Sequence, residues 1–165
     1  MKLRGILFSL IFFIGTSGVT QNALDDLLKK YNSGDVPYTS VEQLRMDQLN
    51  EEVVILDARE GIEYETSHLK DSKFIGSNNL DLSILDSIYR DKQIVVYCSV
   101  GIRSEKIARK VRDLGFEDVK NLYGGIFEWK NTGYPVYDNK GKKTEKIHTY
   151  SKYWSKYLKN GEKIY

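Results

Sequence analysis

The stretch that most constrains this chain runs from Ile94 to Ser104 and holds its only cysteine, Cys98. Residues 94–97 form a short β-branched and aromatic run, typical of a buried parallel strand. After the cysteine, apolar residues recur at helical spacing among charged ones, and Gly115 supplies a C-terminal stop. The pattern therefore predicts a strand, a tight loop and a helix, with Cys98 at the start of the loop.

This position predicts a reactive thiol. The first turn of a helix leaves backbone N–H groups without partners and carries the positive end of the helix dipole, so it favours anions. A thiolate in this setting has its pKa lowered from about 8.5 toward neutral. Gly101 allows the loop to turn tightly, and Arg103 adds a planar cation that suits an oxyanion. Without these neighbours, a lone cysteine would be interpreted as a small buried hydrophobe.

The first 20 residues have the layout of a secretory signal peptide. Lys2 and Arg4 precede an apolar run of eleven residues, 5–15, and small residues follow it. Eleven residues are too few to span a bilayer, which takes about 20. We therefore expect removal of residues 1–20 on export to the periplasm or outside the cell, with no stable membrane insertion.

The charge balance argues against a nucleic acid partner. Without residues 1–20 the chain carries 23 basic and 23 acidic residues, whereas phosphate neutralisation needs a concentrated basic face. The full chain has 165 residues, of which 41% are apolar, and this is enough for one globular domain with its own core.

Predicted strands and helices alternate along the chain. Short apolar or β-branched runs predict strands at 38–39, 53–57, 74–76, 94–97 and 119–122. Helical spacing and capping residues predict helices at 22–31, 40–46, 60–67, 81–89, 103–114 and from 124 onward. This alternation indicates an α/β sandwich around a mostly parallel sheet. Ligands of such folds gather beyond the carboxyl ends of the strands, where Cys98, Asp57 and Arg59 are all predicted to lie.

From about Tyr38 to Val136 the chain resembles a single rhodanese homology domain. The motifs that carry the resemblance are, in order, Leu56-Asp57-Ala58-Arg59-Glu60, Glu63-Tyr64-Glu65, His68-Leu69, Cys98-Ser99-Val100-Gly101-Ile102-Arg103-Ser104, Tyr123-Gly124-Gly125, Trp129 and Gly133-Tyr134-Pro135-Val136. The resemblance implies a three-layer α/β/α sandwich around a mostly parallel sheet. It divides the chain into a signal peptide (1–20), an N-terminal helical extension (21–37), the rhodanese-like domain (38–136) and a basic, aromatic C-terminal extension (137–165).

The resemblance also implies sulfur transfer by nucleophilic catalysis. The Cys98 thiolate would take the outer sulfur of a donor such as thiosulfate, become a persulfide, and pass the sulfur to cyanide, a small thiol or a protein thiol partner. Donor and persulfide would be bound by the loop residues Ser99, Val100, Gly101, Ile102, Arg103 and Ser104. Arg103 would hold the sulfonate end of the donor. No metal or cofactor is expected.

Three other classes of function stay open. A carrier or binding module would hold a persulfide for a partner protein without turning over thiosulfate. A cysteine phosphatase or a related arsenate reductase is disfavoured, because these enzymes use Cys-x5-Arg, whereas four residues separate Cys98 from Arg103 here. A catalytically idle scaffold is the third.

Several other polar residues are given structural interpretations. Asp57 and Arg59 are candidate supporting residues, interpreted first as an ion pair that braces a turn. Ser104 is predicted to cap the helix that follows the loop. His68 is interpreted as a hydrogen-bonding residue at a turn, and His148 as a residue outside any metal site.

The C-terminal extension, 137–165, holds eight lysines, three acidic residues and several aromatic residues. Such a composition can form a basic aromatic patch for nucleic acid or membrane. However, Ile147, Tyr150, Trp154 and Leu158 fall at helical spacing, so we expect an amphipathic helix packed on the domain.

Overall fold

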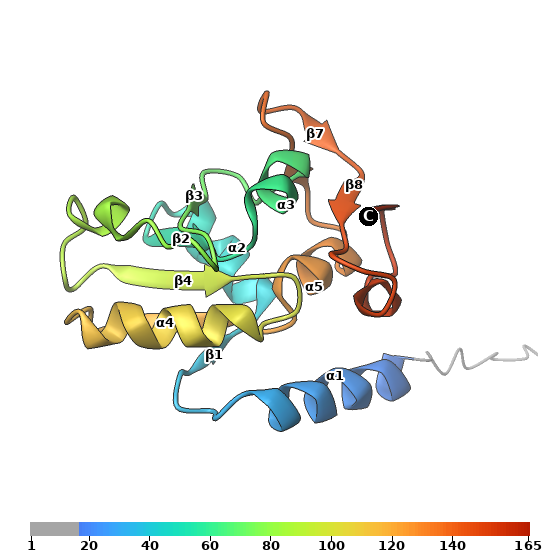
Figure 1. Ribbon diagram of the computed structural model, residues 1–165, viewed down its shortest axis with the longest axis horizontal. Helices are drawn as coiled ribbons and strands as arrows, with labels where there is room; N and C mark the ends of the chain where they lie inside the picture. Colours follow the sequence, from blue (N-terminus) through green and yellow to red (C-terminus); the bar gives the residue numbers. More distant parts are fainter. Residues whose placement is uncertain (1–16) are drawn as a thin grey trace, which may run out of the picture.

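Five short strands pair into one parallel sheet in the computed structural model, which describes residues 17–165 (Figure 1). The strands are β1 (Tyr38–Thr39), β2 (Val53–Asp57), β3 (Lys73–Phe74), β4 (Gln93–Tyr97) and β5 (Val119–Leu122). Their order across the sheet is β1-β5-β4-β2-β3, and each neighbouring pair is parallel. The central strand, β4, is therefore the most enclosed, which is why its sequence is continuously apolar from Ile94 onward.

Helices cover both faces of this sheet. On one face, Ile94 and Val96 of β4 pack in a cluster with α4 (Arg103–Asp113). On the other, Val95 and Tyr97 pack in a cluster with three helices, which are α1 (Ser17–Tyr31), α2 (Val41–Leu49) and α5 (Gly125–Asn131). Alternate strand residues thus face opposite layers, and the predicted α/β sandwich is confirmed.

The predicted helix starts and stops rest on identifiable contacts. The Ser40 hydroxyl accepts a hydrogen bond from the Gln43 N–H at 3.2 Å, so α2 begins as the capping pattern predicted. Helix α2 continues to Leu49, three residues beyond the expected end. Helix α4 ends where expected, because Gly115 takes a left-handed φ of +90°.

The helix predicted at 81–89 is wrong. Only a four-residue 3-10 turn, η1 (Leu82–Leu85), forms there. The Asp81 carboxylate accepts from the Ser83 N–H, and the Ile88 N–H donates to the Leu85 carbonyl, so the local bonds have the shorter 3-10 span. Leu85 is still buried and Ile88 packs against the core, but Leu82 is exposed.

The single amphipathic helix predicted in the C-terminal extension is also wrong. Strand β6 (Val136–Tyr137) pairs with β7 (Lys143–Thr144), β8 (Lys146–His148) pairs with β9 (Glu162–Ile164), and the 3-10 turn η2 (Trp154–Tyr157) lies between β8 and β9. Tyr150 and Gly161 have φ values of +63° and +106°, which no right-handed helix accommodates. Ile147 and Leu158 are nevertheless buried in the same cluster as Val95.

The segment predicted to be a signal peptide, 1–20, lies mostly outside the described residues, and α1 begins at Ser17. Among the residues of α1 whose burial is described, 23–31, Leu24, Leu27 and Leu28 are buried. In the part of the chain that the structure describes, no helix has the length and apolarity needed to cross a membrane.

Gly125 allows α5 to approach the start of the cysteine loop, so we predict that Gly125→Ala strongly destabilises the fold. A Cβ at Gly125 would lie 2.2 Å from the Cys98 carbonyl oxygen, and the residue has a φ of +56°. The two effects together should cost more than about 3 kcal/mol of unfolding free energy, measured by urea denaturation. Gly61→Ala is the matched control, because a Cβ there meets nothing within 4 Å. Equal stability of the two variants would contradict this packing.

Candidate active site

Cys98 follows β4 directly and begins a loop that ends at the first residue of α4. Its side chain is buried, with 1% of the residue exposed. The sulfur accepts the Gly101 N–H at 3.2 Å and lies 3.4 Å from the Ser104 hydroxyl. Gly101 presents its N–H to the sulfur with a φ of +105°, a conformation that a side chain would strain. The predicted tight loop around the thiol is therefore present.

Helix α5 fixes the outer side of this loop. The Ile126 N–H donates to the Cys98 carbonyl at 2.9 Å, and the Phe127 N–H donates to the Ser99 carbonyl at 3.1 Å. With their carbonyl groups held outward, the loop residues can turn N–H groups toward the sulfur. This explains why two consecutive glycines, Gly124 and Gly125, must open α5 where they do.

Ser104 does not cap α4, contrary to the sequence prediction. The N-cap position is Ile102, which has no side-chain capping bond. The Ser104 hydroxyl instead points inward, 2.7 Å from Asn121 Oδ1 and 3.4 Å from the sulfur, and it can donate its one proton to either acceptor. The Asn121 amide donates to the Gly101 carbonyl at 2.8 Å. Ser104 and Asn121 thus connect the sulfur, the loop and β5.

Arg103 forms a two-pronged ion pair with Glu63 of α3 (Gly61–Thr66). Its Nη1 lies 2.7 Å from Glu63 Oε2, and its Nη2 lies 2.8 Å from Oε1. The Ser99 hydroxyl accepts from Nη2 and donates to Glu63, both at 2.9 Å. Burial would raise the pKa of Glu63, but the hydrogen bonds and charge of Arg103 lower it below its ordinary value. The guanidinium predicted to hold a sulfonate is engaged by a buried carboxylate.

The surroundings of Cys98 favour the thiolate. Burial by itself disfavours the charged form, but the positive charge of Arg103 and the hydrogen bonds from Ser104 and Gly101 outweigh it. The pKa of the Cys98 thiol is therefore lowered, in the direction that the strand-to-helix position predicted.

Asp57 and Arg59 form a buried ion pair at the end of β2, and neither side chain is exposed. Arg59 Nη2 lies 2.6 Å from Asp57 Oδ2 and also donates to the Ser67 carbonyl at 2.6 Å. The Tyr97 hydroxyl donates to the same carboxylate at 2.5 Å. Burial is the main cause that raises the pKa of Tyr97, and the negative charge of Asp57 is the second. The arrangement braces the turn after β2, which supports the structural interpretation.

The remaining predicted residues have packing or turn positions. Val100 is buried in the core, and Ile102 is partly buried against it. His68 Nδ1 lies 3.0 Å from the Tyr64 carbonyl, as expected of a turn residue. Among the described residues, no group of three or more His, Cys, Asp or Glu side chains could hold a metal ion.

Sequence reasoning missed Glu63 and Asn121 as partners of the loop. Glu63 belongs to the acidic and aromatic motif after Arg59, and its burial opposite a loop arginine could have been anticipated from that motif. Asn121 carries no comparable signal, because it falls inside a four-residue strand whose sequence suggests only packing.

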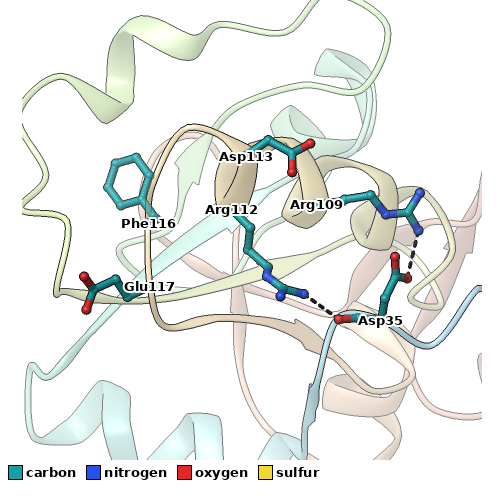
Figure 2. A pocket seen from close by; sticks show the side chains of 6 residues that line it. All are labelled: Asp35, Arg109, Arg112, Asp113, Phe116 and Glu117. Carbon is teal, nitrogen blue, oxygen red and sulfur yellow. Dashed lines mark hydrogen bonds and ion pairs between the residues drawn. The ribbon is translucent and has the colours of Figure 1, made fainter.

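A cleft of about 440 Å³ lies away from Cys98, toward the C-terminal end of α4 (Figure 2). Its arginines are already paired: Arg109 binds the Asp35 carboxylate at 3.0 Å, and Arg112 donates to the Asp35 carbonyl. The cysteine loop leads into the opposite end of the same helix. The cleft is therefore not part of the candidate active site.

Comparisons with known proteins agree with this geometry. A family model described as "Rhodanese-like domain" matches residues 40–132, just over half of the chain. A tRNA uridine(34) hydroxylase from Staphylococcus saprophyticus is 33% identical over 112 residues, which cover 62% of this chain and 33% of that protein. The chain therefore matches only about a third of that curated relative.

Solved structures show the same fold. A crystal structure from Bacillus halodurans has a TM-score of 0.58 and 26% identity, and the match covers 73% of this chain and 88% of that one. The solution structure of a rhodanese-like domain from Anabaena has a TM-score of 0.56 and 25% identity, with coverages of 62% and 79%.

We predict that Ser104→Ala raises the pH at which Cys98 becomes reactive. The substitution removes a hydroxyl 3.4 Å from the sulfur, so the thiolate loses a donor and the thiol pKa rises. The rate of alkylation by iodoacetamide, measured against pH, should have its midpoint at higher pH than in the wild type. The control is Ser67→Ala, since the Ser67 hydroxyl is buried without a hydrogen-bond partner among the described residues. A midpoint that stays in place in Ser104→Ala would exclude this contact as a stabiliser of the thiolate.

We predict that Glu63 and Arg103 are strongly coupled in a double-mutant cycle. Arg103→Gln leaves the fully buried Glu63 carboxylate unpaired and should cost about 3 kcal/mol of unfolding free energy. Glu63→Gln combined with Arg103→Gln should cost less than the sum of the single variants. Because the folded pKa of Glu63 is lowered, its contribution is present above the unfolded value of 4.5 and is lost as pH falls below it. Additive losses in urea denaturation at neutral pH would disprove the coupling.

Proposed function

The chain belongs to the rhodanese-like domain family, and from this premise we propose that it is a sulfurtransferase that works through a persulfide on Cys98. One observation carries the proposal: the buried Cys98 sulfur receives the Gly101 N–H and faces the Ser104 hydroxyl at the start of a helix. These donors can stabilise a thiolate, and they can also stabilise the negative charge of a persulfide in the same loop.

The proposed reaction has two displacements. The Cys98 thiolate attacks the outer sulfur of thiosulfate, the sulfur–sulfur bond of the donor breaks, and sulfite leaves with the electron pair. A thiolate or cyanide then attacks the outer sulfur of the persulfide, and the Cys98 thiolate leaves. The lowered pKa of Cys98 increases the share of the thiolate, which is the nucleophile, so the first step depends less on a general base.

The ion pair with Glu63 limits how Arg103 takes part. Both terminal nitrogens of Arg103 hold the Glu63 carboxylate, so its two-pronged edge is not open to a sulfonate. In the proposed mechanism, the positive charge of Arg103 acts mainly by stabilising the negative charge on the Cys98 sulfur. The N–H groups of the loop bind the sulfur donor. A carrier that holds the persulfide for a protein thiol would use the same site.

Modification of a tRNA uridine is a second candidate, favoured by the name of the curated relative. The C-terminal extension also places the Lys156 ammonium over the rings of Tyr153 and Tyr157, 4.2 Å and 5.1 Å from their centres. Such aromatic and basic groups can stack on bases. The balanced charge of the chain argues against it, and failure to retain total tRNA at low salt would remove this candidate.

Export to the periplasm or outside the cell, expected from residues 1–20, is part of the proposal. It is tested by expressing the full chain in its native host and measuring the mass of the protein. A mature N-terminus between residues 17 and 20 would support export, and an intact N-terminus would oppose it.

We predict that thiosulfate adds one sulfur atom to the wild-type protein and none to Cys98→Ser. The added mass should be measured on the intact protein, and it should disappear on addition of cyanide, with thiocyanate formed in equal amount. Cys98→Ser is a matched control because the hydroxyl nearly preserves the shape of the buried side chain while removing the nucleophile.

The other possible outcomes would favour other classes of function or rule out the proposed one. A persulfide that forms but does not pass to cyanide or to small thiols would favour the carrier. Phosphate release from an aryl phosphate would favour the phosphatase. No added sulfur on the wild type, or equal addition to both proteins, would rule out the sulfurtransferase.

A further inference from the structure

Tyr150, in the C-terminal extension, has an unusual backbone conformation. Among the described residues only three that are not glycine have a left-handed φ: Glu51, Asp71 and Tyr150. Tyr150 is the one with a bulky aromatic ring, for which a φ of +63° is strained. The ring is not held by burial, because 57% of the residue is exposed. A strained, exposed residue of this kind calls for a functional explanation.

The surrounding strands fix this conformation. The Tyr150 N–H donates to His148 Nδ1 at 3.1 Å, at the end of β8. The Thr149 N–H and hydroxyl both donate to the Ile164 carbonyl of β9, at 2.8 Å and 3.1 Å. Ile147, on the same strand, is fully buried in the core. The extension is therefore anchored in the three residues just before Tyr150, and this anchoring can maintain a strained residue at that point.

The ring of Tyr150 lies over Arg103 of the cysteine loop. The guanidinium carbon of Arg103 is 5.1 Å from the ring centre, within the range of a cation–π contact. Strand β8 also lies against α3, the helix that carries Glu63. Glu63 and Ser99 bind the edge of the guanidinium, and its central carbon lies over the ring of Tyr150.

We propose that Tyr150 is a positioning residue for the sulfur site, which holds Arg103 beside Cys98 by covering the face of the guanidinium. The inference rests on the proposed function of Cys98 and names a residue outside the matched range, 40–132, as part of its machinery. The ring excludes water from one side of Arg103, and the charge of Arg103 then acts on the sulfur with less screening. Without the ring, the side chain of Arg103, already 27% exposed, would be more solvated and more mobile.

Few other charged or titratable groups act on this arrangement. Glu63 from α3 binds Arg103 directly, and Arg59 at the end of β2 adds a second positive charge nearby. On the side of β1, the Tyr38 hydroxyl interacts with the Cys98 charge. In the extension itself, the titratable residue His148 accepts the backbone N–H of Tyr150. A change of the Tyr150 side chain keeps that N–H and leaves all four groups in place.

The test is the pH profile of Cys98 alkylation by iodoacetamide, a neutral reagent, in the full chain. Tyr150→Gly removes the ring and suits the left-handed backbone, so it should fold at least as well as the wild type. We expect a higher midpoint and alkylation slower by about two- to fivefold at neutral pH. Tyr150→Phe keeps the ring and should match the wild type. Tyr153→Ala is the control, because Tyr153 contacts Trp154 and Lys156 in the same extension.

Two results would overturn the proposal. One is an unchanged midpoint in a folded Tyr150→Gly, as judged by thermal denaturation. The other is an equal shift in Tyr153→Ala, which would indicate a general effect of the extension. The measurement does not depend on sulfur transfer: if thiosulfate leaves no persulfide on the wild type, the proposed function fails while the alkylation profiles still decide the role of Tyr150.

Discussion

The ion pair between Arg103 and Glu63 is the interaction on which the site depends. It joins α3, which follows β2, to the first residue of α4, which follows β4, and it closes the loop that contains Cys98. A buried carboxylate needs such a partner, because an isolated charge would be costly away from water. The pair also places a negative charge next to Arg103. The thiolate is stabilised by the positive charge of Arg103 and by hydrogen bonds from Ser104 and Gly101.

The sequence predicted the parts of the fold that short-range patterns determine. The run from Ile94 to Tyr97 could only be a buried strand, and the glycine and helix start after Cys98 placed the thiol at the carboxyl edge of the sheet. Asp57 and Arg59 were interpreted as a brace, and their complete burial agrees with that. Each of these predictions needed only neighbours along the chain and the known geometry of parallel sheets.

Two of the failures have a common physical origin in contacts between residues far apart along the chain. Ser104 looked like a helix cap, yet its hydroxyl bonds with Asn121 on another strand, which no local pattern indicates. In the C-terminal extension, Ile147 and Leu158 have helical spacing, but both reach the core from a strand and a turn. Burial of two apolar residues constrains their positions and leaves the path between them open. The left-handed φ of Tyr150, which lies between the two residues, turns that path away from a helix.

Both segments outside the matched range, 40–132, touch the cysteine loop. From the N-terminal side, the Asn32 amide donates to the Gly101 carbonyl at 2.9 Å, and Leu28 packs near the same glycine. From the C-terminal side, Tyr150 covers Arg103. Gly101 and Ser104, which face the sulfur, lie in the matched range, whereas Asn32 and Tyr150, which form part of the walls around the loop, lie outside it. Likeness to relatives therefore transfers the chemistry of Cys98 more directly than the choice of substrate, because a substrate must pass the walls to reach the sulfur.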